Sequence, residues 1–193
     1  MSQGELKSQP ALGFFTVLEH DEQGLVGGYL ILNTSGRPLE FHCTAPVKAN
    51  RAQQILFGPT LDSYLYGEQI GQTLLAKGSI EPLAICTDVQ RALSVRDYVS
   101  LPVALVLKPP AEPAASHQLP PPTSAWRVDP SHAAGPNMHA FEIGRNRLAV
   151  SADRQADGQS IADRLESLAG FNLSEPFERI REAVEESHKN GRG

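Results

Sequence analysis

The alternation of apolar and polar positions in the first 45 residues predicts three strands. Residues 12–20 are rich in aromatic and β-branched side chains, which favour strands. Residues 29–32 form a short apolar run with turn residues on both sides, the pattern of a strand buried on both faces. In residues 37–45, Leu39, Phe41 and Cys43 alternate with polar residues and should share one face. Short turns join these segments, so we expect an antiparallel meander.

The second strand contains two adjacent glycines, Gly27 and Gly28, inside an apolar run. Glycines at such a place indicate a bulge or a close approach of another stretch of backbone. Together with two later strands, the meander should form one sheet with a shared core. We expect this core to bury Leu30, Leu32, Phe41, Ile85, Val103 and Leu105.

After residue 45 the apolar residues recur with a helical period. Asn50 and Gln53 have the spacing of a capping box, in which each side chain binds the other residue's backbone N–H. A longer helical stripe begins with Thr60 as its cap and runs to residue 75. Gly67 and Gly71 lie one turn apart in this stripe and should allow it to pack closely on the sheet.

Two further buried strands are predicted at residues 82–87 and 101–107. Asp88 follows the first of them, where it can cap a short helical segment. The sequence thus predicts an α+β core domain over residues 12–107, preceded by a flexible N-terminus over residues 1–11.

A proline-rich linker at residues 108–136 separates this domain from residues 137–193, a predicted C-terminal hairpin with two helices. The first helix should be capped by Ser160 and Asp163. The last helix carries a narrow apolar stripe made of Phe177, Ile180 and Val184. Such a stripe is too thin to stand alone, so the helices should dock on the core domain or on a partner chain.

Composition narrows the possible functions. The chain has 193 residues, of which 40% are hydrophobic and 20% charged, enough for one good core. Its net charge of −5 argues against a dominant basic surface for nucleic acid. The sequence has no signal-peptide pattern and no apolar stretch of about 20 residues, so we expect a cytoplasmic protein. Cys43 and Cys86 lie in apolar strand patterns and should be inert, buried thiols.

The order of the predicted elements resembles that of the ribonuclease H-like superfamily over residues 12–107. Asn50-Arg-Ala-Gln53 opens the helix after the meander, and Ile85-Cys-Thr-Asp88 closes the next strand with an acid. The resemblance implies a nuclease or phosphodiesterase in which carboxylates hold Mg²⁺. The candidate catalytic residues are Glu19, Asp21, Glu68 and Asp88, of which Glu68 and Asp88 would hold the metal. This chain departs from the pattern because its first strand has no central acid.

The favoured interpretation is a binding or regulatory module that acts through protein–protein contacts and needs no cofactor. Its partner would be another protein or a second copy of the chain, bound through the C-terminal helices. Lys48, Arg51, Arg91 and Arg96 could add a modest basic patch. The candidate binding residues are His42, Arg51, Gln53, Arg91, Phe177, Ile180 and Val184. The Mg²⁺-dependent nuclease is the alternative.

Overall fold

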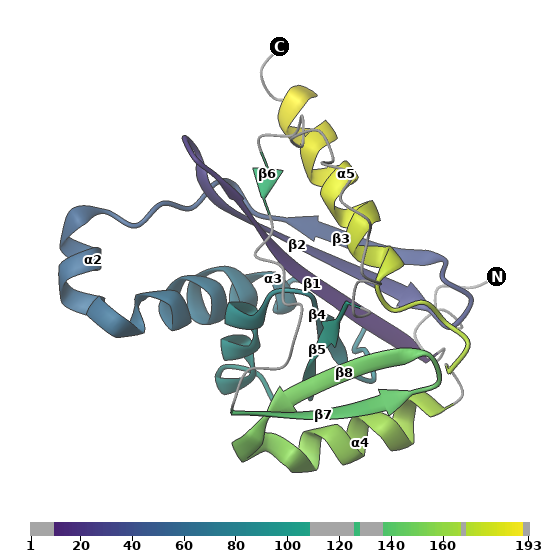
Figure 1. The fold of residues 1–193 in the computed structure, drawn as a ribbon. Helices are drawn as coiled ribbons and strands as arrows, with labels where there is room; N and C mark the ends of the chain where they lie inside the picture. The colour runs from purple at the N-terminus through teal and green to yellow at the C-terminus, as the bar shows by residue number, and fades with distance from the viewer. Residues whose placement is uncertain (1–9, 109–125, 128–136, 167–168, 191–193) are drawn as a thin grey trace, which may run out of the picture.

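The computed structural model describes residues 10–108, 126–127, 137–166 and 169–190 (Figure 1). Most of the predicted flexible N-terminus and most of the proline-rich linker lie outside these ranges, but Ala11, the last residue of that N-terminus, is buried in the first strand. The fold is α+β, as the sequence predicted, with helices packed on a mixed sheet. The first three strands are β1 (Ala11–His20), β2 (Gly24–Asn33) and β3 (Pro38–Cys43), which pair antiparallel in chain order.

The other strands extend the sheet on the far side of β1. β4 (Ile85–Thr87) and β5 (Val103–Leu107) run parallel to β1, and the hairpin of β7 (Met138–Ile143) and β8 (Asn146–Ser151) is added antiparallel to β5. The path through the sheet is β3-β2-β1-β4-β5-β8-β7, and β6 (Trp126–Arg127) pairs with the end of β1. The C-terminal hairpin is therefore part of the main sheet rather than an appendage to it.

Helices cover both faces of the sheet (Figure 1). On one face lie α4 (Gln155–Leu165) and α5 (Glu175–Asn190), with the short turn η4 (Ala152–Arg154) leading into α4. On the other lie the π-helix η2 (Ser63–Gln72), α3 (Thr73–Leu75) and the 3₁₀-helix η3 (Gln90–Asp97). The remaining elements, α2 (Arg51–Phe57) and η1 (Gly58–Thr60), precede η2.

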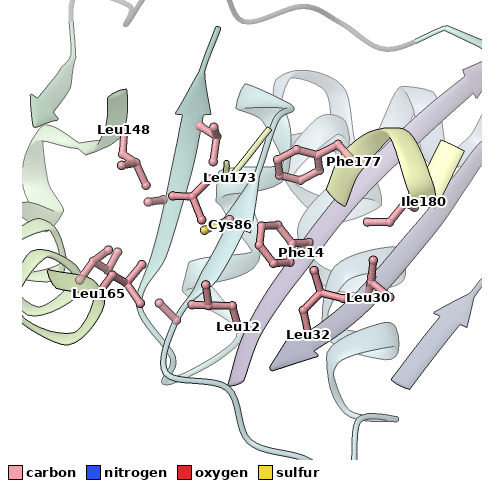
Figure 2. Packing of buried hydrophobic residues seen from close by; sticks show 14 of the residues in the cluster. Leu12, Phe14, Leu30, Leu32, Cys86, Leu148, Leu165, Leu173, Phe177 and Ile180 are labelled. Carbon is pink, nitrogen blue, oxygen red and sulfur yellow. The ribbon is translucent and has the colours of Figure 1, made fainter. Parts of the chain in front are cut away.

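The core on the α5 side is formed by side chains that are far apart in sequence (Figure 2). The ring of Phe14 meets that of Phe177 edge to face, with centroids 5.6 Å apart. Cys86 is fully buried in this cluster, and burial raises the pKa of its thiol to about 12. This thiol is inert at neutral pH, as predicted for Cys86, whereas Cys43 is only half-buried.

Gly27 and Gly28 allow both helical layers to approach the sheet, and the close contacts are with side chains rather than with the backbone. A Cβ on Gly27 would lie 2.2 Å from Cγ2 of Ile70 in η2. A Cβ on Gly28 would lie 2.3 Å from Cγ2 of Ile180 in α5, on the opposite face. Neither contact leaves room for a methyl group, so each glycine fixes the depth at which one helix sits.

The segment predicted as a long α-helix is different in detail. Residues 63–72 form a π-helix, and Thr60 lies in a 3₁₀ turn where its hydroxyl donates to Phe57 O instead of capping a helix. Gly67 and Gly71 do permit close packing, but against η3 rather than the sheet. A Cβ on Gly71 would lie 2.5 Å from Cγ2 of Val95.

The core prediction is wrong for Phe41, which is 38% exposed, and correct for the other five residues. Phe41 lies on the edge strand β3, whereas α5 packs on β1 and β2. The pairing of β2 with β3 also shifts register next to Leu32. Leu39 consequently packs in the η2-side core and Cys43 in the α5-side core, so they do not share a face.

Two predicted helix caps are also wrong. The N-cap of η3 is Val89, and no side chain caps it, so Asp88 does not have that role. Ser160 lies in the middle of α4, which starts five residues earlier at Gln155. The acids of both predicted caps have other partners: Arg181 contacts Asp88, and Gln159 donates to Asp163.

Candidate protein-interaction site

The helix α2 projects from the body of the protein at the end of an extended connection from β3 (Figure 1). Its first turn is held by the predicted capping box: Asn50 Oδ1 accepts from Gln53 N at 2.8 Å, and Gln53 Oε1 accepts from Asn50 N at 3.0 Å. At the other end, Gly58 has φ 48°, a conformation that favours glycine. The helix is thus well capped although none of its seven side chains is buried.

The apolar stripe of α2 faces solvent. Leu56 is 82% exposed and Ile55 is 65% exposed. Ala52 and Pro59 are also exposed, and the spacing of these four residues places them along one side of a helical turn and its continuation. We call Ala52, Ile55, Leu56 and Pro59 the α2 surface. A helix normally turns such a stripe towards the core, so its exposure here requires an explanation.

An aromatic stack at the end of α2 connects this helix to η2. The ring of Phe57 lies on that of Tyr64, with centroids 4.0 Å apart and an interplanar angle of 16°. Phe57 ends α2 and Tyr64 belongs to η2, so the stack joins the projecting helix to the helical layer on the sheet. The α2 surface is therefore presented on a structured support.

A polar cluster lies farther along, where η2 meets the end of β1. The hydroxyl of Tyr66 donates to Glu19 Oε1 at 2.8 Å, and Arg91 Nη1 lies 3.3 Å from the same oxygen. Arg91 Nε also lies 3.5 Å from Asp62 Oδ2. Glu19 and Arg91, predicted to be catalytic and binding residues respectively, are thus brought together, and their contacts tie η2 and η3 to β1.

The other predicted binding residues have several different environments. Arg51 and Gln53 lie in α2, where Arg51 is exposed and Gln53 forms the capping box. His42 Nε2 lies 3.1 Å from Glu40 Oε2 on the edge strand. In the predicted basic patch, the Arg96 guanidinium is bound by Asp157, with Nε 2.6 Å from Oδ2.

Phe177, Ile180 and Val184 are buried against β1 and β2 of the same chain. The apolar stripe of the last helix therefore docks in cis, one of the two outcomes expected for it. These three side chains form part of the core and do not offer a surface to a partner.

The predicted catalytic carboxylates are spread over the molecule. Asp88 is 6% exposed under α5, Glu19 is bound by Tyr66, Asp21 lies in the turn after β1, and Glu68 is exposed on η2. Within the described residues, no three His, Cys, Asp or Glu side chains are grouped so that they could hold a metal ion.

The surroundings of Asp88 do not fit a divalent cation. Its Oδ2 accepts a hydrogen bond from Arg181 Nη2 of α5, so a guanidinium already balances the carboxylate. The residue beside it on β1 is Thr16, a neutral side chain whose Oγ1 is buried. Burial raises the pKa of Asp88, and the charge of Arg181 opposes that shift. A carboxylate that is already paired with a guanidinium, and that belongs to no group of three possible metal ligands in the described residues, is a poor site for Mg²⁺.

Ile55 and Leu56 were not among the candidates found from the sequence. Their signal was present, because apolar residues at 52, 55, 56 and 59 have helical spacing. Periodicity shows that a helix has an apolar side but not whether that side is covered. Only the path of the chain away from the sheet shows that it is open.

Comparison with known proteins adds no assignment: no protein-family model, curated protein or solved structure matches this chain. Among the described residues, the helices are all too short or too polar to cross a membrane.

Proposed function

We propose that the chain is a protein-binding module and that the α2 surface is its contact site. The observation that supports this most directly is the exposure of Ile55 and Leu56 on a capped helix that buries none of its own side chains. Exposed apolar side chains grouped on a projecting element are typical of protein-interaction sites. A short amphipathic helix that inserts its apolar side into a groove is a common mode of recognition.

The chemistry of the α2 surface indicates the kind of partner. Covering Ile55 and Leu56 would contribute about 1.5–3 kcal/mol each, which is less than the roughly 8 kcal/mol needed for micromolar affinity. The partner must therefore also contact residues around α2. Arg51 is exposed on α2, and Lys48 is exposed on the connection that leads into α2. An apolar groove with acidic residues on its rim would complement both features.

A photo-crosslinking experiment tests this proposal. A benzophenone amino acid placed at Gln54, beside the stripe, should yield a defined adduct in extract of the source cells, and the Leu56→Ser change should remove it. Arg145→Ser, at an exposed position in the turn between β7 and β8, is the control and should leave the adduct unchanged. With the purified partner, Leu56→Ser should lower affinity about tenfold or more, as expected for an apolar residue at the centre of an interface.

The proposal fails if adduct formation is the same with and without Leu56→Ser, or if no adduct forms. Sedimentation of the full-length protein distinguishes a second copy from a different partner, because self-association through α2 would disappear in the Leu56→Ser variant. The ribonuclease H-like alternative receives less support, since Asp88 is paired with Arg181 and the other candidate carboxylates lie elsewhere. Mg²⁺-dependent cleavage of RNA or DNA hairpins, lost in Asp88→Asn, would favour it instead.

A further inference from the structure

A cavity of about 430 Å³ opens between the end of α3, the loop at residues 76–82 and the segment that follows η3. This volume is within the range of small-molecule sites. Its walls include Leu75, Ile80 and Leu101, so the interior favours a hydrocarbon group. The cavity is not part of the α2 surface, and the inference below does not depend on the proposed function.

Two tyrosines contribute to the lining of the cavity, Tyr29 from β2 and Tyr98 after η3. The phenol of Tyr29 lies across β1 where Gly13 has no side chain: a Cβ there would be 3.0 Å from the Tyr29 hydroxyl oxygen. Burial, and to a smaller extent the charge of Glu40, raises the pKa of Tyr29 above its ordinary value. Tyr29 therefore stays neutral, and because it is almost fully buried, the half-buried Tyr98 is the more accessible of the two rings.

The charge around the cavity is negative. Glu81 lines it, and its lining contains no Lys, Arg or His among the described residues. Behind the lining residue Ser79, Glu40 Oε2 accepts from Ser79 N at 3.0 Å and lies 3.1 Å from His42 Nε2. Burial tends to raise the pKa of Glu40, but the hydrogen bonds from Ser79 and His42 outweigh it and lower the pKa. Glu40 is consequently ionised at neutral pH.

We propose that this cavity binds an apolar amine. The ammonium group would meet Glu81 and the half-buried ring of Tyr98, since an aromatic ring attracts cations through its quadrupole. The hydrocarbon part would fill the space lined by Leu75, Ile80 and Leu101. An anion would be repelled by Glu81 and Glu40, and a neutral molecule would gain only the apolar contacts.

Three small probes of similar shape test the charge preference: 2-phenylethylamine, 2-phenylethanol and phenylacetate. Binding to the full chain is followed by chemical-shift changes in nuclear magnetic resonance spectra. The amine should bind about fivefold or more tightly than the alcohol, the factor expected from one partly exposed ion pair, and phenylacetate should bind most weakly. Glu81→Gln should remove the preference for the amine, whereas Glu68→Gln, with the same charge change on the outer side of η2, should keep it.

A second variant locates the site. Ala76→Phe adds a side chain at an exposed position of the lining and should abolish binding of the amine without unfolding the protein. A peptide of the form acetyl-Leu-Lys-Leu-amide, compared with its acetyl-lysine counterpart, shows whether the amine can be a lysine of another protein. The inference is wrong if neither amine binds, if the alcohol binds as well as the amine, or if Glu81→Gln and Glu68→Gln behave alike.

Discussion

Arg181 in α5 donates a hydrogen bond to the carboxylate of Asp88 at the end of β4, across 93 positions of sequence. The side chains are only 18% and 6% exposed respectively, so both charges have left most of their water. Such a pair contributes little net stability, but loss of one partner leaves the other charge buried and uncompensated. This contact fixes the position of α5 over the parallel strands.

Arg181→Met should therefore lower the free energy of unfolding by about 3–5 kcal/mol, measured by denaturant titration. The double change Asp88→Asn with Arg181→Met should recover a large part of that loss, because no unpaired charge remains. A loss of less than about 1 kcal/mol in the single variant would mean that Asp88 is not held as a buried ion by Arg181.

The close approach at Gly28 provides a test of the α5 layer. Gly28→Ala would place a methyl group 2.3 Å from Cγ2 of Ile180, so the helix must shift outward. We expect a cost of about 1–3 kcal/mol in the free energy of unfolding, as for other overpacked cores. Gly170→Ala is the control, because a Cβ there meets no atom within 4 Å. Equal behaviour of the two variants would contradict the close packing.

The two phenylalanines of the α5 face should respond very differently to truncation. Phe177 is 1% exposed and meets Phe14 edge to face, so Phe177→Ala should cost about 3–5 kcal/mol. Phe41 is 38% exposed on the edge strand, so Phe41→Ala should cost about 1 kcal/mol. Denaturant titration of both variants gives the two losses in the free energy of unfolding. If Phe41→Ala loses as much as Phe177→Ala, the edge strand β3 must be covered.

Local features of the sequence predicted much of the sheet. Strand-forming residues, apolar runs and alternation predicted the meander, and Asn50 with Gln53 predicted the start of α2. The adjacent glycines Gly27 and Gly28 marked a place of close approach, although not which elements approach there. These features depend on neighbours in the chain, which a sequence displays directly. The α+β class follows from them.

The features that the sequence did not predict depend on tertiary contacts. Phe41 reads as a core residue because alternation cannot show that β3 is an edge strand beyond the reach of α5. Asp88 reads as a helix cap because its partner Arg181 lies in a distant helix. Helical spacing alone does not distinguish Leu56 from a buried residue of an apolar stripe. Only the path of the chain shows that this stripe is exposed to solvent.

Glu40 should make stability depend on pH in the acid range. Its hydrogen bonds from Ser79 and His42 lower its pKa in the folded state below the unfolded value of about 4.3. Its contribution is therefore fully present above pH of about 4.3 and is lost as pH falls through the folded pKa. Glu40→Gln should reduce the free energy of unfolding by about 1–3 kcal/mol at pH 6, and the gap to the natural chain should narrow towards pH 3. If the difference in the free energy of unfolding between the two proteins is the same at pH 3 as at pH 6, the pKa of Glu40 is not lowered by folding.

The capping box of α2 should matter locally but not globally. Asn50→Ala removes the acceptor for Gln53 N, which costs a helix about 1 kcal/mol. Because α2 buries none of its side chains, this loss should loosen α2 without weakening the sheet. Hydrogen exchange at residues 54–57 should become about fivefold faster, while the denaturant midpoint stays nearly unchanged.

The same variant links the fold of α2 to its proposed role. If the partner recognises the preformed helix, Asn50→Ala should weaken binding by about the same fivefold factor, because the partner must then supply the energy that orders α2. Gln54→Ala, an exposed change that leaves the capping box intact, should have a smaller effect on both measurements. A drop in the global midpoint comparable to that of a core variant would show that α2 is coupled to the sheet, and the view of α2 as an independent contact element would then be wrong.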